Sequence, residues 1–450
     1  MFSKKIFFTQ ILPVALLIFM RMVSSVTADA SYFILAIYAL FGRVQIIQAL
    51  ALSWLFTFLN PGISPEVAMA GIGRYFVLAS SMISIFFRSG IGSREDIRVN
   101  GFIFLTLLGG VGVLFHSIIF SRVLDVSLLK AISWIAAFVT LFSAWKGLCV
   151  RDRELVEKQI FGGLLGIMFV SIPLLVSASG YFRNEVGFQG VLNHPQAFGA
   201  TMALLGAWLL SRVFVKKSPS WIVVLFFIIT VVLIFLSMAR TAGLGLLLAI
   251  FSSVVFGLFF GRRKFAEFLP GLQSGRVKFF LFFVVFCGVF FAPFFVANVQ
   301  NFILKGGENS SLAGAYESSR GFLIERMIEN IKKRPYGGIG FGMSSDPEIM
   351  DIQRDPVFGL PTGAPVEKGV GFLAIWEEIG LFGFLGVLGW LWIMLRRAER
   401  NGGLPALMVC MTVVLMNFGE FTLFSAGGMG MLSLILITWA SSGKSPEKVG

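Results

Sequence analysis

Residues 221–260 read WIVVLFFIITVVLIFLSMARTAGLGLLLAIFSSVVFGLFF, and Arg240 is the only charged residue among them. Two apolar runs, 221–238 and 242–260, flank a short break at 237–241. Each run is close to the roughly 20 residues that a helix needs to cross about 30 Å of hydrocarbon. Because every backbone polar group in lipid must be bonded within the chain, such runs must be helices. The stretch predicts two membrane-spanning helices joined by a turn.

The rest of the 450-residue chain repeats this pattern. Hydrophobic residues make up 56% and charged residues 14%, with a mean hydropathy of +0.86, whereas about a quarter of a soluble protein is charged. The other apolar runs cover residues 6–20, 31–41, 44–59, 74–87, 101–121, 127–149, 160–179, 196–214, 279–298, 369–395, 404–424 and 427–440. We therefore predict an all-α, polytopic transmembrane helical bundle with about 12–14 spans.

The basic residues predict the orientation of this bundle. The formal net charge is +13, and Lys and Arg concentrate in cytoplasmic loops of membrane proteins. Lys4 and Lys5 place the N-terminus in the cytoplasm. If the runs on either side of Gly42-Arg43 formed one helix, every later basic cluster would fall on the other side of the membrane. We therefore expect two helices joined by a hairpin there. The basic clusters that then share the cytoplasmic side are 88–98, 151–158, 216–217, 262–264 and 396–400.

This topology indicates a multi-pass protein of the bacterial inner membrane, with no nucleic-acid partner. The N-terminal segment also fits a signal peptide, with Ala28-Asp29-Ala30 as a small-residue cleavage motif. Since the remaining chain spans the membrane, we expect an uncleaved first helix.

Counting the spans from a cytoplasmic N-terminus leaves one long loop on the outer side of the membrane, which we expect to be periplasmic. It divides the chain into a bundle (1–298), the loop (299–368) and C-terminal transmembrane helices (369–450). A loop of this length is usually functional. Residues 317–334 alternate apolar and charged side chains at helical spacing, which predicts an amphipathic helix lying at the membrane surface. Pro335 and the glycines that follow it would end this helix.

Three arginines lie on the side that membrane proteins deplete of basic residues. Arg183 is in an outer loop, Arg240 in the break at 237–241, and Arg320 at the start of the amphipathic helix. A guanidinium group forks onto phosphate oxygens, so together they predict a diphosphate site. The alternative for each arginine taken singly is that its side chain extends to the membrane–water interface and binds no substrate.

His194, Glu377 and Glu378 are further site candidates. His194 is a candidate base or phosphate donor, or else only starts a helix that Asn193 caps, with Pro195 at the first helical position. The two carboxylates lie inside an apolar run, where charge is expensive and usually functional. Adjacent helical residues diverge by about 100°, so we expect at most one to face a given site. Hydrogen bonding to a neighbouring helix is the alternative.

Two other groups are interpreted as structural. His116 lies inside an apolar run and predicts packing or a buried hydrogen bond. Asp346, Glu348, Asp351 and Asp355 match no metal-ligand spacing. We therefore expect no metal and no cofactor.

Five motifs occur in a recognisable order over roughly residues 180–385: GVLNHPQAFG (190–199), SMART (237–241), SRG (319–321), KKRPYGGIG (332–340) and EEIGLFG (377–383). With the single large external loop, this set resembles the O-antigen ligase and O-antigen/exopolysaccharide polymerase superfamily of bacterial membrane glycosyltransferases. The resemblance implies that Arg183, Arg240 and Arg320 bind the diphosphate of a polyprenyl-linked glycan at the periplasmic face.

The same resemblance points to a polymerase-like or otherwise divergent member. The ligases carry a histidine late in the large loop, whereas residues 365–369 read PVEKG here. Glu367 is the replacement candidate for the catalytic base. The expected partners are a polyprenyl-diphosphate-linked oligosaccharide, the growing glycan and the lipid bilayer. A chain-length regulator and a flippase are candidate protein partners.

Two other classes of function stay open. A transporter or lipid-linked glycan flippase would place ionisable residues near the bilayer midplane at broken helices. Most charges here lie outside or near the outer helix ends, but Glu377, Glu378 and Glu420 keep this alternative open. A noncatalytic assembly subunit would make the three arginines individually dispensable.

Overall fold

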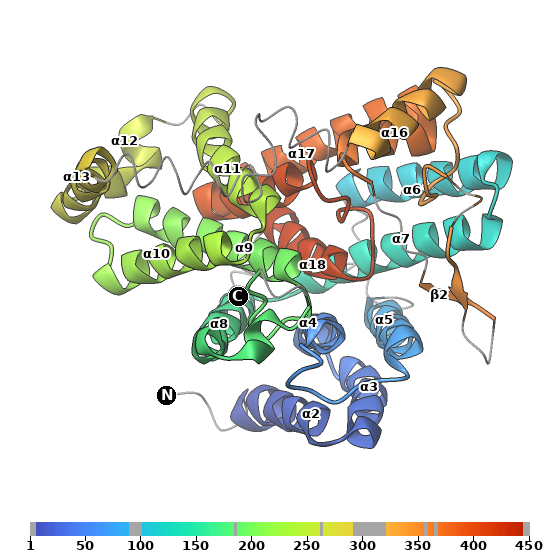
Figure 1. The fold of residues 1–450 in the computed structure, drawn as a ribbon, viewed down its shortest axis with the longest axis horizontal. Coiled ribbons are helices and arrows are strands. Elements are labelled where there is room, and N and C mark those ends of the chain that lie inside the picture. Colours follow the sequence, from blue (N-terminus) through green and yellow to red (C-terminus); the bar gives the residue numbers. More distant parts are fainter. Residues whose placement is uncertain are drawn as a thin grey trace.

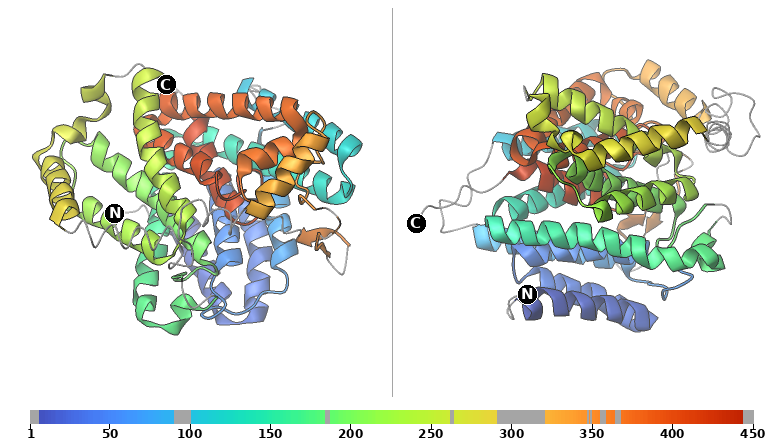
Figure 2. Two further views of the ribbon diagram at one scale, coloured as in Figure 1. Left: turned by 45° about the horizontal axis from the view of Figure 1, so that its top comes forward. Right: turned by 90° about the vertical axis from the view of Figure 1, so that its left-hand side faces the viewer.

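The structure is a computed structural model. It describes residues 6–89, 101–183, 187–261, 264–290, 321–346, 348, 350–354, 359–363 and 368–443. Helices dominate this part of the chain, and many of them run in roughly the same direction (Figure 2). The predicted fold class, an all-α polytopic bundle, is confirmed.

The first half of the chain forms the helices at the bottom and right of Figure 1. They are α2 (Leu12–Val23, preceded by the π-helical turn Phe7–Ile11), α3 (Ser25–Ala39), α4 (Arg43–Phe58), α5 (Ala70–Ser89), α6 (Gly101–Phe120), α7 (Leu124–Lys146) and α8 (Val150–Ser171).

Short 3-10 turns at Ile172–Val176 and Ala178–Tyr181 lead into the second half. Its helices are α9 (Pro195–Val215), α10 (Trp221–Leu236), α11 (Arg240–Phe259), α12 (Phe265–Phe268), α13 (Gly275–Phe290), α16 (Phe322–Lys333), α17 (Gly371–Met416) and α18 (Met429–Ser442). A further 3-10 turn, Pro270–Gln273, lies between α12 and α13.

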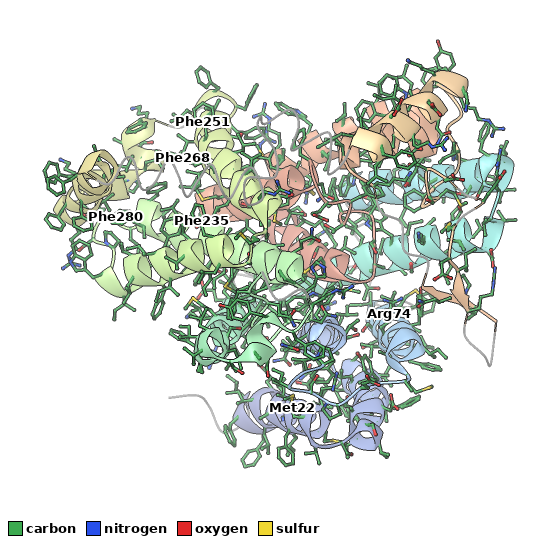
Figure 3. The ribbon with its side chains drawn as sticks, in the orientation of Figure 1. Met22, Arg74, Phe235, Phe251, Phe268 and Phe280 are labelled. Carbon is green, nitrogen blue, oxygen red and sulfur yellow. The ribbon has the colours of Figure 1, made fainter. Side chains whose placement is uncertain are left out.

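Seven helices in the described ranges are long and apolar enough to cross a membrane by length and composition, and five shorter segments are apolar. The bundle also carries large apolar side chains on its outside. Phe251 is 69% and Phe235 45% exposed, and both are labelled in Figure 3. Exposed phenylalanines at this density suit contact with lipid rather than water.

The predicted hairpin at Gly42-Arg43 is confirmed, because α3 and α4 are separate helices. The Arg43 guanidinium donates to the carbonyl oxygen of Gly147, 2.6 Å away. This bond satisfies a carbonyl at the end of α7 and joins two turns on the same side of the bundle.

The helix ends form two opposite faces. On one face Asn60 bonds to Gly190, Phe188 to Leu236, and Gly371 to Asn417. We call this the loop face; it comprises residues 59–69, 177–183, 187–194, 237–240, 334–345 and 417–428. On the other face, the opposite face, Arg153 bonds to Trp439 and Arg397 to Ser441. These contacts agree with the alternation of spans predicted from the basic clusters.

Helix α17 is broken at two glycines. Its 46 residues would extend about 70 Å at 1.5 Å per residue, over twice the hydrocarbon thickness. Gly380 (φ 70°) and Gly403 (φ 62°) have left-handed backbone that interrupts it. The break at Gly403 separates the two predicted spans, but the second ends at Met416 instead of continuing to residue 424. Asn417 ends it, since its Oδ1 accepts from the backbone N–H groups of a turn, at residues 422 and 423.

The basic segment 151–158, predicted as part of a loop, is instead the start of α8. Arg153 is buried and donates to the carbonyl oxygen of Trp145 and to Ser442 Oγ. The helix can start this early because these bonds satisfy the guanidinium group at the junction of α7, α8 and α18.

The large loop is described in part. The predicted amphipathic helix is present as α16, which packs along α17 (Figure 1). Its Met327 is buried. Residues 317–320 lie outside the described residues. Beyond α16, the loop carries one small antiparallel pair of strands, β1 (Gln353–Arg354) and β2 (Pro361–Gly363).

Candidate functional site

The outer loop before α9 is fixed to the loop face by Asn60. The Asn60 side chain is fully buried, and its Nδ2 donates to the carbonyl oxygens of Ser179 (2.7 Å) and Gly190 (2.8 Å). Leu59 and Leu192 also form an isolated bridge. A single amide thus fixes both sides of the loop that carries Arg183 and His194.

His194 is the N-cap of α9. Its Nδ1 accepts from the backbone N–H of Gln196 (3.1 Å), and Pro195 occupies the first helical position as predicted. The prediction that Asn193 is the cap is wrong; Asn193 Nδ2 instead points to the carbonyl oxygen of Thr57 (3.4 Å).

The surroundings of His194 favour the neutral imidazole. Partial burial, and secondarily the positive charge of Arg183, lower the pKa of His194 below its usual value near 6.5. Arg183 itself is exposed, and its backbone N–H donates to Gln189 Oε1 (3.0 Å). At neutral pH the ring therefore carries no charge, and Nδ1 remains free of a proton to accept the capping bond.

Arg240 begins α11 directly after a tight turn in which Met238 has a left-handed φ of 54°. This turn packs closely on the start of α9, because a Cβ at Gly199 would collide with the Ala239 side chain. A Cβ at Gly187 would lie 3.0 Å from the Ser237 carbonyl oxygen. The structure thus brings the segments of Arg183, His194 and Arg240 together on the loop face.

The turn after α17 joins the same group of segments. Gly419 packs against the side chain of Thr241, the neighbour of Arg240, and leaves no space for a Cβ. The backbone N–H of Gly371, at the start of α17, donates to the Asn417 carbonyl oxygen (2.8 Å). The starts of α9, α11 and α17 therefore meet around residues 417–428.

Glu377 and Glu378 form a buried ionic cluster with Lys368. Lys368 Nζ lies 2.7 Å from Glu377 Oε2 and 3.0 Å from Glu378 Oε1, and all three side chains are at most 1% exposed. The prediction that at most one carboxylate faces a given site is wrong. The angle between adjacent helical side chains does not prevent this, because Lys368 lies outside the helix and reaches between them.

The glycine-rich segment 336–342 passes beside this cluster. The backbone N–H groups of Ile339 and Gly340 donate to the carbonyl oxygens of Glu377 (2.9 Å) and Glu378 (3.0 Å). Gly380 breaks the helix at this point, and this frees the two carbonyls to accept bonds from outside the helix.

Helices α6 and α7 hold the other side of the same segment. His116 Nε2 lies 2.5 Å from the carbonyl oxygen of Gly337, Ser127 Oγ donates to Phe341 (2.6 Å), and Lys130 Nζ donates to Gly342 (2.7 Å). His116 was predicted to pack or to make a buried hydrogen bond. It makes a hydrogen bond, but the residue is only partly buried.

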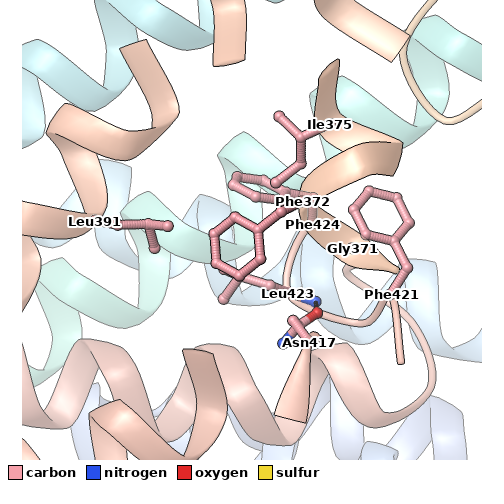
Figure 4. Close-up of a pocket in the computed structure, with 8 residues that line it drawn as sticks. All are labelled: Gly371, Phe372, Ile375, Leu391, Asn417, Phe421, Leu423 and Phe424. Atoms are coloured by element: carbon pink, nitrogen blue, oxygen red, sulfur yellow. Dashed lines mark hydrogen bonds between the residues drawn. The ribbon is translucent and has the colours of Figure 1, made fainter. Parts of the chain in front are cut away.

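A small apolar pocket lies at the start of α17 (Figure 4). It is lined by Gly371, Phe372, Ile375, Leu391, Asn417, Phe421, Leu423 and Phe424. Its only polar side chain, Asn417, is already bonded to the backbone of the following turn. The pocket therefore offers no polar group to bind a sugar.

Comparison with known families finds one similarity. Residues 225–388 match the family model described as O-antigen ligase. This part of the chain, somewhat over a third of its length, is similar to the O-antigen ligase superfamily. The match includes Arg240, the described part of the large loop and the Lys368–Glu377–Glu378 cluster, and ends before Gly403. No curated protein matches the chain.

This similarity indicates a ligase- or polymerase-type function in glycan synthesis. Together with the apolar helices, it makes the chain a multi-pass membrane protein of this enzyme type. The residues that match the family model include both the start of α11 and the broken start of α17.

Two of the predicted site residues, Arg320 and Glu367, lie outside the described residues. Their roles remain predictions, as do those of Arg183, Arg240 and His194. Within the described ranges no group of three or more His, Cys, Asp or Glu residues is placed to hold a metal ion.

Sequence reasoning missed three residues that act on Glu377 or Glu378. Lys368 is paired with both carboxylates, Asn330 Nδ2 donates to Glu377 Oε1, and the charge of Lys130 acts on Glu378. Lys130 lies in an apolar run and was a detectable signal, since a lone lysine inside a span is as costly as the glutamates. Lys368 directly precedes a span, where a basic residue usually has an interfacial role. Asn330 carries no signal, because a polar residue in an amphipathic helix is ordinarily solvated.

Proposed function

We propose that the protein is a membrane glycosyltransferase that polymerises polyprenyl-diphosphate-linked oligosaccharide units at the periplasmic face of the bacterial inner membrane. The observation that carries this proposal is the gathering of Arg183, His194 and Arg240 at one face of a bundle whose family acts in glycan synthesis. A polymerase accounts for the absence of histidine from residues 365–369.

Arginine suits the diphosphate of such a substrate. Arg240 stands at the N-terminus of the 20-residue helix α11, where the helix dipole favours an anion. Arg183 and Arg320 would add further guanidinium groups. Charge that develops on the leaving diphosphate would then be stabilised by groups already oriented in the protein.

The proposed reaction is a displacement at the anomeric carbon of a lipid-linked sugar. A hydroxyl oxygen of a second glycan forms the new bond to that carbon, and the bond from the carbon to the diphosphate oxygen breaks. Glu367 would accept the hydroxyl proton as general base. The polyprenyl chain would lie against the exposed apolar helices, with a flippase supplying substrate and a chain-length regulator limiting the product.

The decisive experiment is elongation by the purified protein. Protein in detergent receives a polyprenyl-diphosphate oligosaccharide, and longer glycans are sought by gel and mass spectrometry. Elongation should be lost in Arg240→Ala, Arg320→Ala and Glu367→Gln. Arg122→Ala is the matched control, because Arg122 is an exposed arginine that pairs with Glu348 (3.3 Å). Full elongation by the three variants at normal expression would disprove the assigned roles.

One observation favours a second function, a flippase of lipid-linked glycan. α17 is broken at Gly380 beside three buried charged groups, an arrangement that transporters use for substrate and ion sites. Proteoliposomes with a fluorescent lipid-linked glycan distinguish the two functions. Movement of intact glycan between leaflets without elongation would favour the flippase.

A further inference from the structure

We propose that Lys368, Glu377 and Glu378 form an ionic latch that positions the large loop for glycosyl transfer. This inference rests on the proposed function, and none of the three residues is assigned to the chemical step. The latch joins the outgoing arm of the loop, residues 330–345, to its return end at Lys368.

The outgoing arm binds both carboxylates. Asn330 Nδ2 donates to Glu377 Oε1 (2.7 Å), and Ser345 Oγ donates to Glu377 Oε2 (3.0 Å). The backbone N–H of Gly342 donates to Glu378 Oε2 (2.7 Å). Asn330 of α16, and Gly342 and Ser345 of the segment that follows it, are therefore all bonded to two adjacent side chains of α17.

The return end binds the same carboxylates. Lys368 Nζ donates to Glu377 Oε2 at 2.7 Å and lies 3.0 Å from Glu378 Oε1. Glu377 Oε2 thus accepts from both arms at once. Since 22 residues separate Ser345 from Lys368 by number, this oxygen fastens two distant points of the loop to one atom.

The charges explain why the latch is sensitive to substitution. Two buried carboxylates against Lys368 alone would leave one negative charge, and Lys130 is the fourth member of the group. Lys130 Nζ donates to the Gly342 carbonyl oxygen (2.7 Å), and its charge acts on Glu378. Burying an unbalanced charge is costly, so loss of Lys368 should drive the carboxylates apart and release the arms.

The latch is connected to the proposed diphosphate site by a short path. Lys368 lies three residues before Gly371, which bonds to Asn417, and the same turn packs against Thr241 through Gly419. Through this path the latch sets the distance between the loop and the start of α11. An error of about 1 Å in such a distance can cost about 100-fold in rate.

The test compares Lys368→Met, Glu377→Gln and the double variant, purified in detergent. The readouts are kcat and KM for the lipid-linked donor, and hydrogen exchange over residues 322–345. Glu157→Gln is the control, because its ion pair with Arg212 lies on the opposite face. We expect each single variant to lower kcat at least about tenfold, with KM nearly unchanged, and to speed exchange in the loop.

The double variant removes one charge of each sign and should be less impaired than the two single effects combined. Wild-type kcat and unchanged exchange in Glu377→Gln would overturn the latch, even if Lys368→Met fails to fold. Faster exchange with unchanged kcat would show a purely structural cluster and overturn the positioning role. No elongation by the wild type would disprove the proposed function itself, while the exchange data would still decide whether the latch exists.

Discussion

Gly380 is the residue on which the broken start of α17 depends. Its φ of 70° disfavours any side chain, and a Cβ there would collide with the carbonyl oxygen of Tyr336. We expect Gly380→Ala to destabilise the protein by about 2 kcal/mol or more, measured by thermal unfolding in detergent. Gly386→Ala, at an open position of the same helix, should instead be neutral or stabilising. Equal effects of the two substitutions would contradict the strained geometry at Gly380.

His194 makes a pH-dependent contribution to stability. Burial, then the charge of Arg183, place its folded-state pKa below the unfolded value of about 6.5. Unfolding therefore takes up a proton below that pH, so the contribution is present at neutral pH and is lost as the pH falls. The difference in melting temperature between wild type and His194→Asn should shrink from pH 7.5 to pH 5.5.

The Arg183→Gln variant is the control for this titration. It removes the secondary cause of the shift, so the pKa of His194 should move back toward its usual value and the effect of pH on stability should weaken. A melting-temperature difference that stays constant across this pH range in the wild type would contradict a lowered pKa.

The sequence predicts the structural role of an individual residue only where a local rule applies. Pro195 at the first turn of α9 and the hydrogen-bonded His116 follow from such rules. The meeting of Lys368 with both glutamates does not, because it requires the chain to return from a long loop to a helix broken at Gly380. A glycine inside an apolar run looks the same in sequence whether its backbone is helical or left-handed.

At the scale of elements, one loop depends on one amide. Asn60 donates to carbonyl oxygens on both sides of the segment that carries Arg183, and Asn60 Oδ1 accepts from the backbone N–H of Gly62 (2.8 Å). Asn60→Ala leaves these groups without partners, so we expect a loss of about 2–4 kcal/mol, measured by thermal unfolding. Elongation should fall with it, because Arg183 and His194 lose their fixed positions.

Asn401→Ala is the matched control for that substitution. Asn401 Nδ2 donates to the carbonyl oxygen of Ser441 on the opposite face (3.2 Å), in a single, longer bond. If Asn60→Ala loses the expected stability but keeps full elongation, the loop before α9 does not serve the reaction.

The sequence predicts well which segments form helices, but it predicts less well where each helix begins and ends. Apolar runs reveal which segments enter the membrane, because the hydrocarbon thickness fixes their length. They do not reveal that α8 begins already at Val150 or that Asn417 ends α17. The start of α8 depends on bonds from Arg153 to α18, which is distant in sequence. The end of α17 depends on bonds from the Asn417 side chain to the turn that follows it, and the apolar pattern does not reveal that turn.

At the scale of the whole molecule, the two faces carry different chemistry. The opposite face holds most of the basic clusters and their bonds to helix ends, whereas the loop face holds α16, the ionic latch and the segments of Arg183, His194 and Arg240. The positive-inside rule then predicts that the loop face lies in the periplasm. This assignment is what makes a periplasmic glycosyl transfer possible, so it requires a direct test.

Native and introduced cysteines provide that test. Cys149 is exposed at the opposite face and Cys410 is buried; Lys332 is an exposed position of α16. In spheroplasts that carry Cys287→Ser, which removes the third cysteine of the chain, a membrane-impermeant maleimide should label the protein only after permeabilisation. Cys149→Ser should then abolish that labelling. Adding Lys332→Cys to Cys149→Ser should restore labelling in intact spheroplasts, because α16 would face the periplasm. The reverse pattern would place the loop in the cytoplasm and contradict the proposed site of polymerisation.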